Sequence, residues 1–326
     1  MAFNTTINTS LLTTYLIKKF IPTLEAELQF QKFTTPAIIP EGGGKIGRFN
    51  VFSNIPATST PLVEGATTGN AITTLTTTGT DCTIAEYGEY LQVTQLESLA
   101  AVKGTRDALS KRFAFGGAYA LDSLVRAAAT HTNAGTTFYC GNTSAVGGST
   151  TAAIPGSGSA SALIGAAKLL RYVTTAGEPN TMAQGFSGKS GHADGDFAAI
   201  VSPQFEATMV TEGTTGRMTW GQANTNVGGA MGQEKVIKGR MGAVYGTTCY
   251  RTQNFSQVTV TSLSDINYLL ADGGVGAVAF GDMKPTIIVN DLNSPYKNVD
   301  TVAWHAYFGT ALVDAKRVIK MYSNAV

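Results

Sequence analysis

The stretch from residue 36 to residue 83 most limits what this chain can fold into. It is rich in Thr, Gly and Pro and holds few large apolar side chains, so it cannot form a hydrophobic core of its own. Extended pieces are expected at Ile46–Phe52 and at residues 72 to 78, after a glycine hinge at residues 42 to 44. Because two strands alone are only marginally stable in water, we predict a long two-stranded loop that leaves the body of the molecule. A strand at residues 87 to 93 then returns to the body.

Two long helices are predicted, one on either side of this loop. Leucine or phenylalanine recurs at every fourth position from residue 12 to residue 28, which is the spacing of an amphipathic helix over residues 13 to 30. Pro22 predicts a kink in this helix. The second helix is expected at Thr105–Ala129, where Thr105 can cap the first turn.

The remainder mixes helices and strands, which predicts an α+β fold. A Gly/Ser-rich surface loop is expected between residues 131 and 159, and a helix at residues 161 to 176. A buried strand at Phe197–Val201 leads to a helix capped by Ser202 that runs to residue 210. The predicted strands of the last third are residues 236 to 252, Val275–Phe280, residues 286 to 289, and a half-buried strand at residues 313 to 321.

The composition points to a surface that other protein covers. Charged residues make up 14% of the chain, against roughly 25% in an ordinary soluble domain, although charge is what keeps a monomer soluble. The net charge of +1 gives no overall case for binding nucleic acid or membrane. We expect no secretory signal and no membrane span, and the three cysteines are too far apart to indicate a disulfide framework or a zinc site.

Two short motifs resemble known binding sites, one for phosphate and one for a metal ion. Residues 183 to 190 fit a relaxed phosphate-loop pattern, but neither the preceding strand nor the following helix that such a loop needs is predicted. Residues 192 to 196 contain metal-ligand types without the full ligand set of a calcium loop, and we expect a solvated turn there. With three scattered histidines and no nucleophile beside them, the sequence predicts no enzyme, no cofactor, no metal and no catalytic residue.

The helix predicted at Thr105–Ala129 is rich in cations near its start. The favoured interpretation is a solvated helix face, and the functional alternative is a basic wall that faces DNA. The residues assigned to that wall are Lys103, Arg106, Lys111 and Arg112.

The order of these elements resembles the tailed-bacteriophage major capsid protein family, most closely the branch found in large-virion podoviruses. The local matches are residues 61 to 65 and 87 to 90 on and after the loop, residues 201 to 203, residues 280 to 282, and the final strands at residues 304 to 321. Each match is short, and the resemblance lies in their order and spacing over nearly the whole chain.

The resemblance implies a fold and its divisions. The fold has an N-terminal arm, an extended β-hairpin loop, a long spine helix with a peripheral β-sheet, and an α+β axial domain. In this chain the arm would be residues 1 to 44 and the extended loop residues 45 to 85. The peripheral domain with the spine helix would be residues 86 to 159 and 276 to 326, and the axial domain residues 160 to 275.

The resemblance also implies a function. Such a protein self-assembles through hexamers and pentamers into the icosahedral head shell around double-stranded DNA, inside the host bacterial cytoplasm. Its expected partners are itself, scaffolding, portal and possible decoration proteins, and packaged DNA without sequence specificity, with no membrane. The residues expected to contact a neighbouring subunit are Leu16, Phe20, Leu24, Phe49, Val51, Leu62 and Glu64.

Two alternatives remain open at this point. An encapsulin-like nanocompartment shell would share the fold and enclose a cargo enzyme instead of DNA. A β-rich phage fibre or receptor-binding protein would instead form an elongated trimer, and the long predicted helices argue against it.

Overall fold

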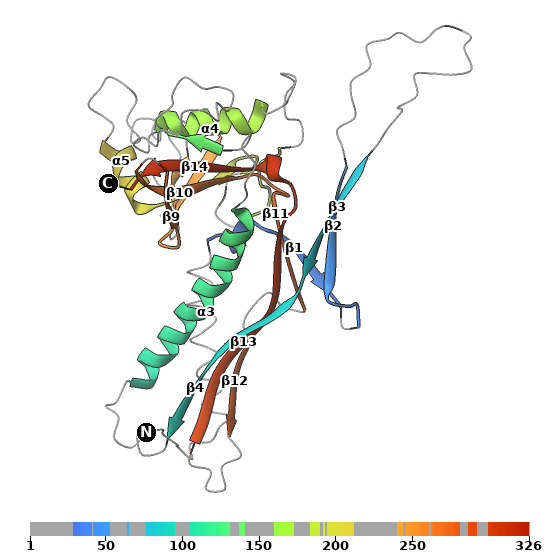
Figure 1. Cartoon of the computed structure of the whole chain (residues 1–326), viewed down its shortest axis with the longest axis vertical. Coiled ribbons are helices and arrows are strands. Elements are labelled where there is room, and N and C mark those ends of the chain that lie inside the picture. The colour runs from blue at the N-terminus through green and yellow to red at the C-terminus, as the bar shows by residue number, and fades with distance from the viewer. Residues whose placement is uncertain are drawn as a thin grey trace.

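The computed structural model describes residues 29–40, 42–52, 64, 76–94, 105–130, 137–140, 160–172, 183–189, 192, 194–211, 240–243, 246–260, 262–280, 286–291 and 299–325. Within these ranges the strands form two large sheets and one separate hairpin. Figure 1 shows one large sheet at the top of the molecule, the other running down from it, and the hairpin projecting to one side. No described helix is long and apolar enough to cross a membrane.

The upper sheet has seven strands in the order β5-β14-β10-β6-β8-β7, with β9 also paired to β10. Its strands are β5 (Thr137–Tyr139), β6 (Phe197–Val201), β7 (Arg240–Ala243), β8 (Thr247–Arg251), β9 (Ser256–Thr259), β10 (Leu263–Leu270) and β14 (Val318–Asn324). Every residue of β6 is buried, because both faces of this sheet are covered.

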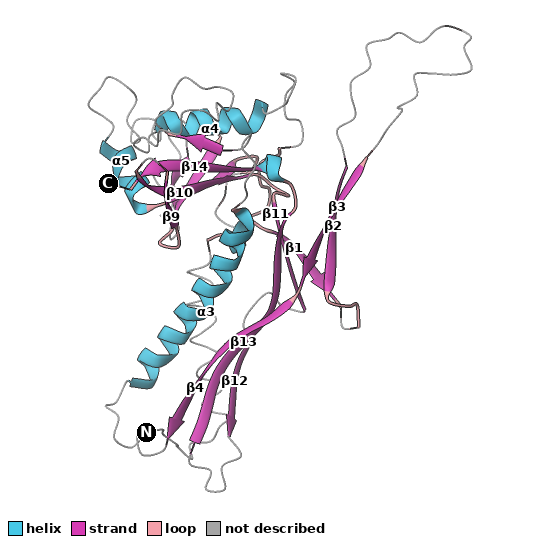
Figure 2. Ribbon diagram, in the orientation of Figure 1, coloured by secondary structure: helices cyan, strands magenta, loops and turns pink. Residues whose placement is uncertain are grey.

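Three helices cover the two faces of this sheet (Figure 2). They are α3 (Thr105–Ala129), α4 (Ala160–Tyr172) and α5 (Pro203–Thr211). Phe197, Ala199 and Val201 of β6 share a core with α4 and α5. The alternate residues Ala198 and Ile200 share a second core with α3, as the two-residue period of a strand requires.

The second large sheet has five strands and connects the upper sheet to the far end of the molecule. Its strands are β1 (Thr35–Ile39), β4 (Ala85–Thr94), β11 (Val275–Phe280), β12 (Thr286–Asp291) and β13 (Val299–Leu312). The order is β1-β11-β13-β12, and β4 pairs antiparallel with β13 over ten residues. Leu121 and Val125 of α3 lie in one core with Trp304 and Phe308 of β13, so the helix packs on this sheet.

The hairpin consists of β2 (Ile46–Phe52) and β3 (Thr77–Thr83), paired antiparallel from Ile46↔Thr83 to Phe52↔Thr77. Neither strand joins another described sheet. Figure 1 shows the pair leaning away from the body beside β1 and β11. This confirms the predicted two-stranded loop and its first strand.

Several predicted elements are confirmed, together with the α+β class. The helix Thr105–Ala129 has the predicted bounds, as do the strands Phe197–Val201 and Val275–Phe280. Ser202 caps α5 as expected, since the Phe205 N–H donates to the Ser202 hydroxyl over 3.3 Å. The strand that returns after the loop is β4, which includes residues 87 to 93.

The helix predicted at residues 13 to 30 does not include residues 29 and 30. Gln29 and Phe30 are not helical, and a short 3₁₀ helix, η1 (Gln31–Phe33), follows them. The backbone N–H groups of residues 29 to 31 bond to the carboxyl of Asp122, so they cannot bond to carbonyls one turn earlier. The rest of this helix prediction lies outside the described residues.

The prediction missed the central strand of the upper sheet. Strand β10 is buried from its second residue to its last, although it contains Ser264, Asp265 and Asn267. These polar groups are paired: the Asn267 amide accepts from the Ser202 N–H over 2.7 Å and donates to the Ser323 hydroxyl over 2.9 Å. Because the side chains are bonded to one another, their polarity does not signal exposure.

The half-buried strand predicted at residues 313 to 321 is a strand only from Val318 onward, and its first four residues are all buried. The chain forms a 3₁₀ helix, η5 (Ala315–Arg317), before β14 begins, and even Lys320 of β14 is buried. Strand β14 lies between β10 and β5 in the upper sheet. That sheet therefore includes β5 and β14, which lie outside residues 160 to 275. The predicted division into domains stays a prediction.

Candidate intersubunit surfaces

The base of the β2–β3 hairpin is packed on the body. Phe49 of β2 lies over Gly276 of β11, where a Cβ atom would come within 2.6 Å of the Phe49 ring. Cys82 of β3 shares a small core with Ile39, Ile84 and Val278. The glycines expected to form a hinge make a turn instead, in which the Gly43 N–H donates to the Pro40 carbonyl over 3.0 Å. The base of the hairpin is therefore held in place by contacts with the body.

Further along, the hairpin has little cover from its own chain. Phe52, at the far end of β2, is 59% exposed. An exposed ion pair, Arg48 with Asp81 over 3.4 Å, joins the two strands. Large exposed apolar side chains on a projecting strand are what a neighbouring protein covers.

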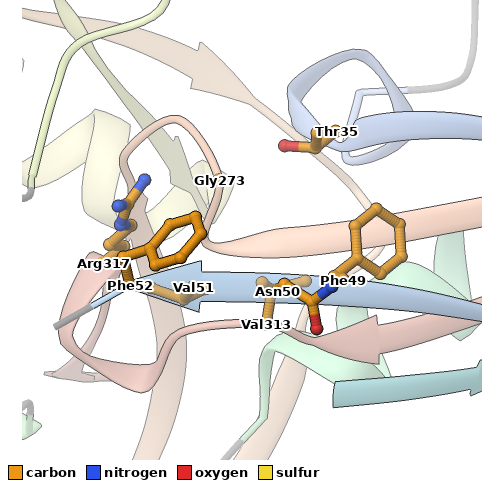
Figure 3. Close-up of a pocket in the computed structure, with 8 residues that line it drawn as sticks. All are labelled: Thr35, Phe49, Asn50, Val51, Phe52, Gly273, Val313 and Arg317. Atoms are coloured by element: carbon orange, nitrogen blue, oxygen red, sulfur yellow. The ribbon is translucent and has the colours of Figure 1, made fainter. Parts of the chain in front are cut away.

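A groove separates the hairpin from the body, with a volume of about 350 Å³. In Figure 3, Phe52 and Arg317 lie at one end of the groove, and Phe49 and Thr35 at the other. The lining residues are Thr35, Phe49, Asn50, Val51, Phe52, Gly273, Val313 and Arg317. The Arg317 guanidinium is held by Asp314 over 3.2 Å and by the Asp272 carbonyl over 2.8 Å. The Thr35 hydroxyl oxygen is buried and has no hydrogen-bond partner among the described residues.

The outer face of the five-stranded sheet carries a second group of exposed aromatic side chains. Tyr90 of β4 is 70% exposed and Tyr307 of β13 is 42% exposed. His305 packs edge-on against Tyr307, and its Nδ1 lies 4.0 Å from a carboxylate oxygen of Glu86. Tyr87, on the opposite face of β4, instead packs into the core beneath α3. The β2–β3 hairpin covers this face of the sheet at Gly276, Val278 and Gly309, and Tyr90 and Tyr307 lie on the part that stays exposed.

The structure places only some of the predicted contact residues. Phe49 and Val51 lie on β2 and line the groove. Phe49 packs at least partly on its own chain, through Gly276. Glu64 lies in an exposed turn. The four others lie outside the described residues: Leu16, Phe20, Leu24 and Leu62.

The predicted DNA-facing residues remain a prediction. Lys103 lies outside the described residues, and the other three lie in the first half of α3, where only the helix itself is described. These three are Arg106, Lys111 and Arg112.

The segment that fits the relaxed phosphate-loop pattern, residues 183 to 190, forms over its described residues a loop beside the upper sheet that is held by its own hydrogen bonds. Phe186 and Asp196 form an isolated β-bridge, and the Gly188 N–H donates to Asp194 over 2.9 Å. Residues 183 to 189 are not helical. The Lys189 ammonium donates to the Thr34 carbonyl over 3.0 Å, and burial lowers the pKa of this lysine while Asp272 opposes that shift. The cation that a phosphate loop would offer to a nucleotide is bound to this chain's own backbone.

The solvated turn predicted at residues 192 to 196 is not what the structure has at His192. This imidazole packs against Phe33, Phe186 and Tyr250. Its two nitrogens lie 2.9 Å from the Tyr250 hydroxyl and 2.9 Å from the Asp196 carbonyl. His192 is therefore a packing residue.

The described residues were compared with the side-chain groups that bind metals or act as thiol nucleophiles. They contain no group of three or more His, Cys, Asp or Glu side chains that could hold a metal ion. All three cysteines are buried, and burial raises the pKa of the Cys140 thiol to about 12, so it stays protonated near neutral pH.

The sequence interpretation missed three features of these surfaces: the exposed Tyr90 and Tyr307, the groove, and the buried Asp122. The alternation of Tyr87 and Tyr90 on a strand could have indicated the first. The groove and Asp122 depend on segments far apart in the chain, so no local pattern carries them.

Comparison with known proteins gives the fold. No protein-family model matches the sequence, and no curated protein matches it. The structure is similar to the capsid of Ralstonia phage GP4, with a TM-score of 0.71 and 12% identity over 92% of each chain. It is also similar to the head structure of Helicobacter pylori bacteriophage KHP40, with a TM-score of 0.63 and 9% identity over 92% of this chain and 91% of that one. A third similar structure is the capsid of cyanophage P-SCSP1u, with a TM-score of 0.57 and 16% identity over 91% of this chain and 89% of that one. The chain thus has the phage capsid fold along nearly its whole length.

Proposed function

We propose that this chain is the major capsid protein of a tailed bacteriophage, a shell-forming protein with no catalytic site. The observation that carries the proposal is the β2–β3 hairpin, which packs on the body at its base and projects beyond it with the exposed Phe52. The fold shared with the capsids of several phages supports the same conclusion. The mixed α+β architecture does not favour a β-rich fibre.

The hairpin of one subunit would lie across the next subunit. Its exposed Phe52 would find an apolar partner there. The exposed Tyr90 and Tyr307 of the five-stranded sheet are candidates for the receiving surface. Such head-to-tail contacts join different surfaces of identical subunits, so they close into rings when the rotation allows it.

Many modest contacts are enough for a shell, because each subunit in a lattice makes several at once. Hexamers and pentamers of this chain would form the lattice, with scaffolding, portal and possible decoration proteins as further partners in the host cytoplasm. Lys103, Arg106, Lys111 and Arg112 would face the packaged DNA and offset part of its phosphate charge.

Shortening the hairpin tests the proposal. Phe52 and Thr77 are paired across the hairpin, so an Asn-Gly turn can replace residues 53 to 76 and leave β2, β3 and the groove in place. We expect the shortened subunit to stay folded, with an unchanged urea midpoint, and to form no closed shells in negative-stain electron microscopy. Shells from the shortened chain would contradict the proposal.

Two point variants test whether a new charge blocks assembly only when it lies on the hairpin. Phe52→Asp places a charge on the exposed hairpin and should block shell formation without a change in subunit stability. Val258→Asp is the matched control, because Val258 is an exposed β-branched residue on β9, outside both candidate surfaces. Equal assembly of the two variants would count against a role for the hairpin.

A further inference from the structure

The middle of α3 carries an apolar surface that is only half covered. Phe115 is 48% exposed and Tyr119 is 46% exposed, and their rings stack with the centres 6.1 Å apart. Because residues four apart lie one above the other on a helix, the two rings form a continuous strip along α3. Neighbouring aromatic side chains left in water indicate a surface that other protein covers. We call Phe115 and Tyr119 the aromatic strip.

The aromatic strip forms one wall of a small groove. The opposite wall is the segment between β8 and β9, at Thr252, Gln253 and Asn254. Asp122, three residues beyond Tyr119 on α3, also lines the groove. The Asn254 amide donates to the Asp122 carboxyl over 2.9 Å, so the two walls are held together at this end.

The described part of the N-terminal arm begins at the Asp122 end of the groove. The backbone N–H groups of residues 29 to 31 donate to the Asp122 carboxyl, and the Phe30 N–H does so over 2.8 Å. Phe30 is fully buried and packs edge-on against Tyr268, with the ring centres 5.5 Å apart. These contacts fix the arm at residue 29. The chain before residue 29 therefore starts at the end of the groove.

We propose that the aromatic strip is the docking surface of the segment that precedes residue 29 in the same subunit, with Leu24 and Leu28 covering it. Leucine or phenylalanine stands at every fourth position from residue 12 to residue 28, which is the spacing of the predicted amphipathic helix. The two leucines are four residues apart, as the two rings are. On two helices that run side by side, each leucine would therefore meet one ring.

Attachment and length favour the same chain as the occupant. Tyr119 and Phe115 lie three and seven residues before Asp122, about 5 and 10 Å along the axis of α3. The two leucines lie one and five residues before residue 29, about 2 and 8 Å along a helix. They can reach the strip without a linker. Because they are attached beside it, their local concentration exceeds that of a free partner.

This inference concerns the free subunit and goes beyond the proposed shell function. The sequence predicts contacts with a neighbouring subunit for Leu16, Phe20 and Leu24, and the inference assigns Leu24 to its own subunit instead. A shell can form whether the strip is covered by its own chain or by another copy. The two proposals therefore fail separately.

Disulfide trapping in the full, unassembled chain tests the inference. One variant carries Leu24→Cys with Phe115→Cys, and a second carries Leu28→Cys with Tyr119→Cys, so that each keeps the other leucine–ring contact. We expect a mild oxidant to bridge most chains internally, as measured by mass spectrometry of the linked peptides. The native cysteines are buried and should stay unreacted. Leu24→Cys with Val258→Cys is the matched control and should form few bridges, because Val258 is exposed on β9.

Hydrogen exchange of the free subunit gives a second readout. Amides of residues 13 to 28 should be protected in the wild type. Phe115→Ala with Tyr119→Ala should lower that protection about tenfold, because the exposed halves of two rings amount to roughly one buried side chain. Tyr90→Ala with Tyr307→Ala is the matched control, since it removes two exposed rings from the five-stranded sheet, and it should leave the protection unchanged. Unchanged protection of β6 and β10 would show that each variant is folded.

Three results would overturn the inference. Disulfides between chains, seen as dimers on a non-reducing gel, would show that a second copy covers the strip. Absence of bridges in both cysteine pairs would show that the segment lies elsewhere. Protection of residues 13 to 28 that is absent in the wild type, or unchanged in the alanine variant, would show that the strip does not hold them. Should a cysteine variant not fold, the exchange of the alanine variant still decides.

Discussion

The upper sheet and the β2–β3 hairpin are both built from strands, but they differ in how much of each is buried by the chain itself. Strand β6 is buried along its whole length between α4 and α5 on one face and α3 on the other. The hairpin has two strands, contacts the body at its base, and leaves Phe52 more than half exposed. The upper sheet is covered on both faces by its own chain, whereas the hairpin is covered by its own chain only at its base.

This difference shows how one chain can be both stable and ready to assemble. The free energy of folding comes from the region with two covered faces, where apolar side chains leave water. The exposed side chains of the hairpin add little to that free energy, so they are available for contacts with another subunit. The three predictions below test whether the two regions differ in this way.

The largest effect is expected in the core between α4 and the upper sheet. Leu163 of α4 is fully buried there. Leu163→Ala should lower the free energy of unfolding by about 2 to 5 kcal/mol, because it removes apolar contacts and leaves a cavity. Urea denaturation of the unassembled subunit measures this loss. A loss as small as that of an exposed hairpin residue would remove the distinction between the two regions.

A smaller effect is expected where the hairpin base meets the body. A methyl group at Gly276 would press on the Phe49 ring, so Gly276→Ala should cost about 1 to 3 kcal/mol. Removing the ring should relieve the clash. The double variant with Phe49→Ala should therefore be no less stable than Phe49→Ala alone. Simple addition of the two losses would show that the hairpin base is not seated on β11.

The smallest effect is expected on the hairpin itself. Arg48 and Asp81 form an ion pair whose side chains are both more than half exposed. Arg48→Ala should change subunit stability by between about 0 and 1 kcal/mol, since solvent and salt screen such a pair. Thermal unfolding at low and high salt would detect a larger contribution, which would mean that the hairpin stabilises the subunit more than its exposure implies.

The sequence predicted the elements whose pattern is local. The helix Thr105–Ala129 follows from its apolar spacing, and the capped helix after Phe197–Val201 follows from Ser202 and Pro203. The projecting hairpin was predictable because residues 36 to 83 lack apolar side chains for a core. The order of these elements was enough to indicate the capsid fold.

The features that were missed depend on partners far away in the chain. Strand β10 appeared too polar for a central strand, but Asn267 is bonded to Ser202 and Ser323, both distant in sequence. Strand β14 was predicted to be half-buried, because its alternation does not reveal that it pairs with β10 on one side and β5 on the other. Among the candidate surfaces, the groove requires β2, η5 and the turn at Gly273 to meet, and Asp122 requires the arm to return to α3.

Hydrogen exchange compared between the free subunit and the assembled particle tests the central claim most directly. The amides of β2 and β3 should gain protection on assembly, while those of β6 and β10 should be protected equally in both states. This result would show that another subunit covers the hairpin in the particle, and that the upper sheet is already fully covered in the free subunit. Unchanged exchange at β2 and β3 in assembled material, or a chain that remains a compact monomer under all assembly conditions, would contradict the claim.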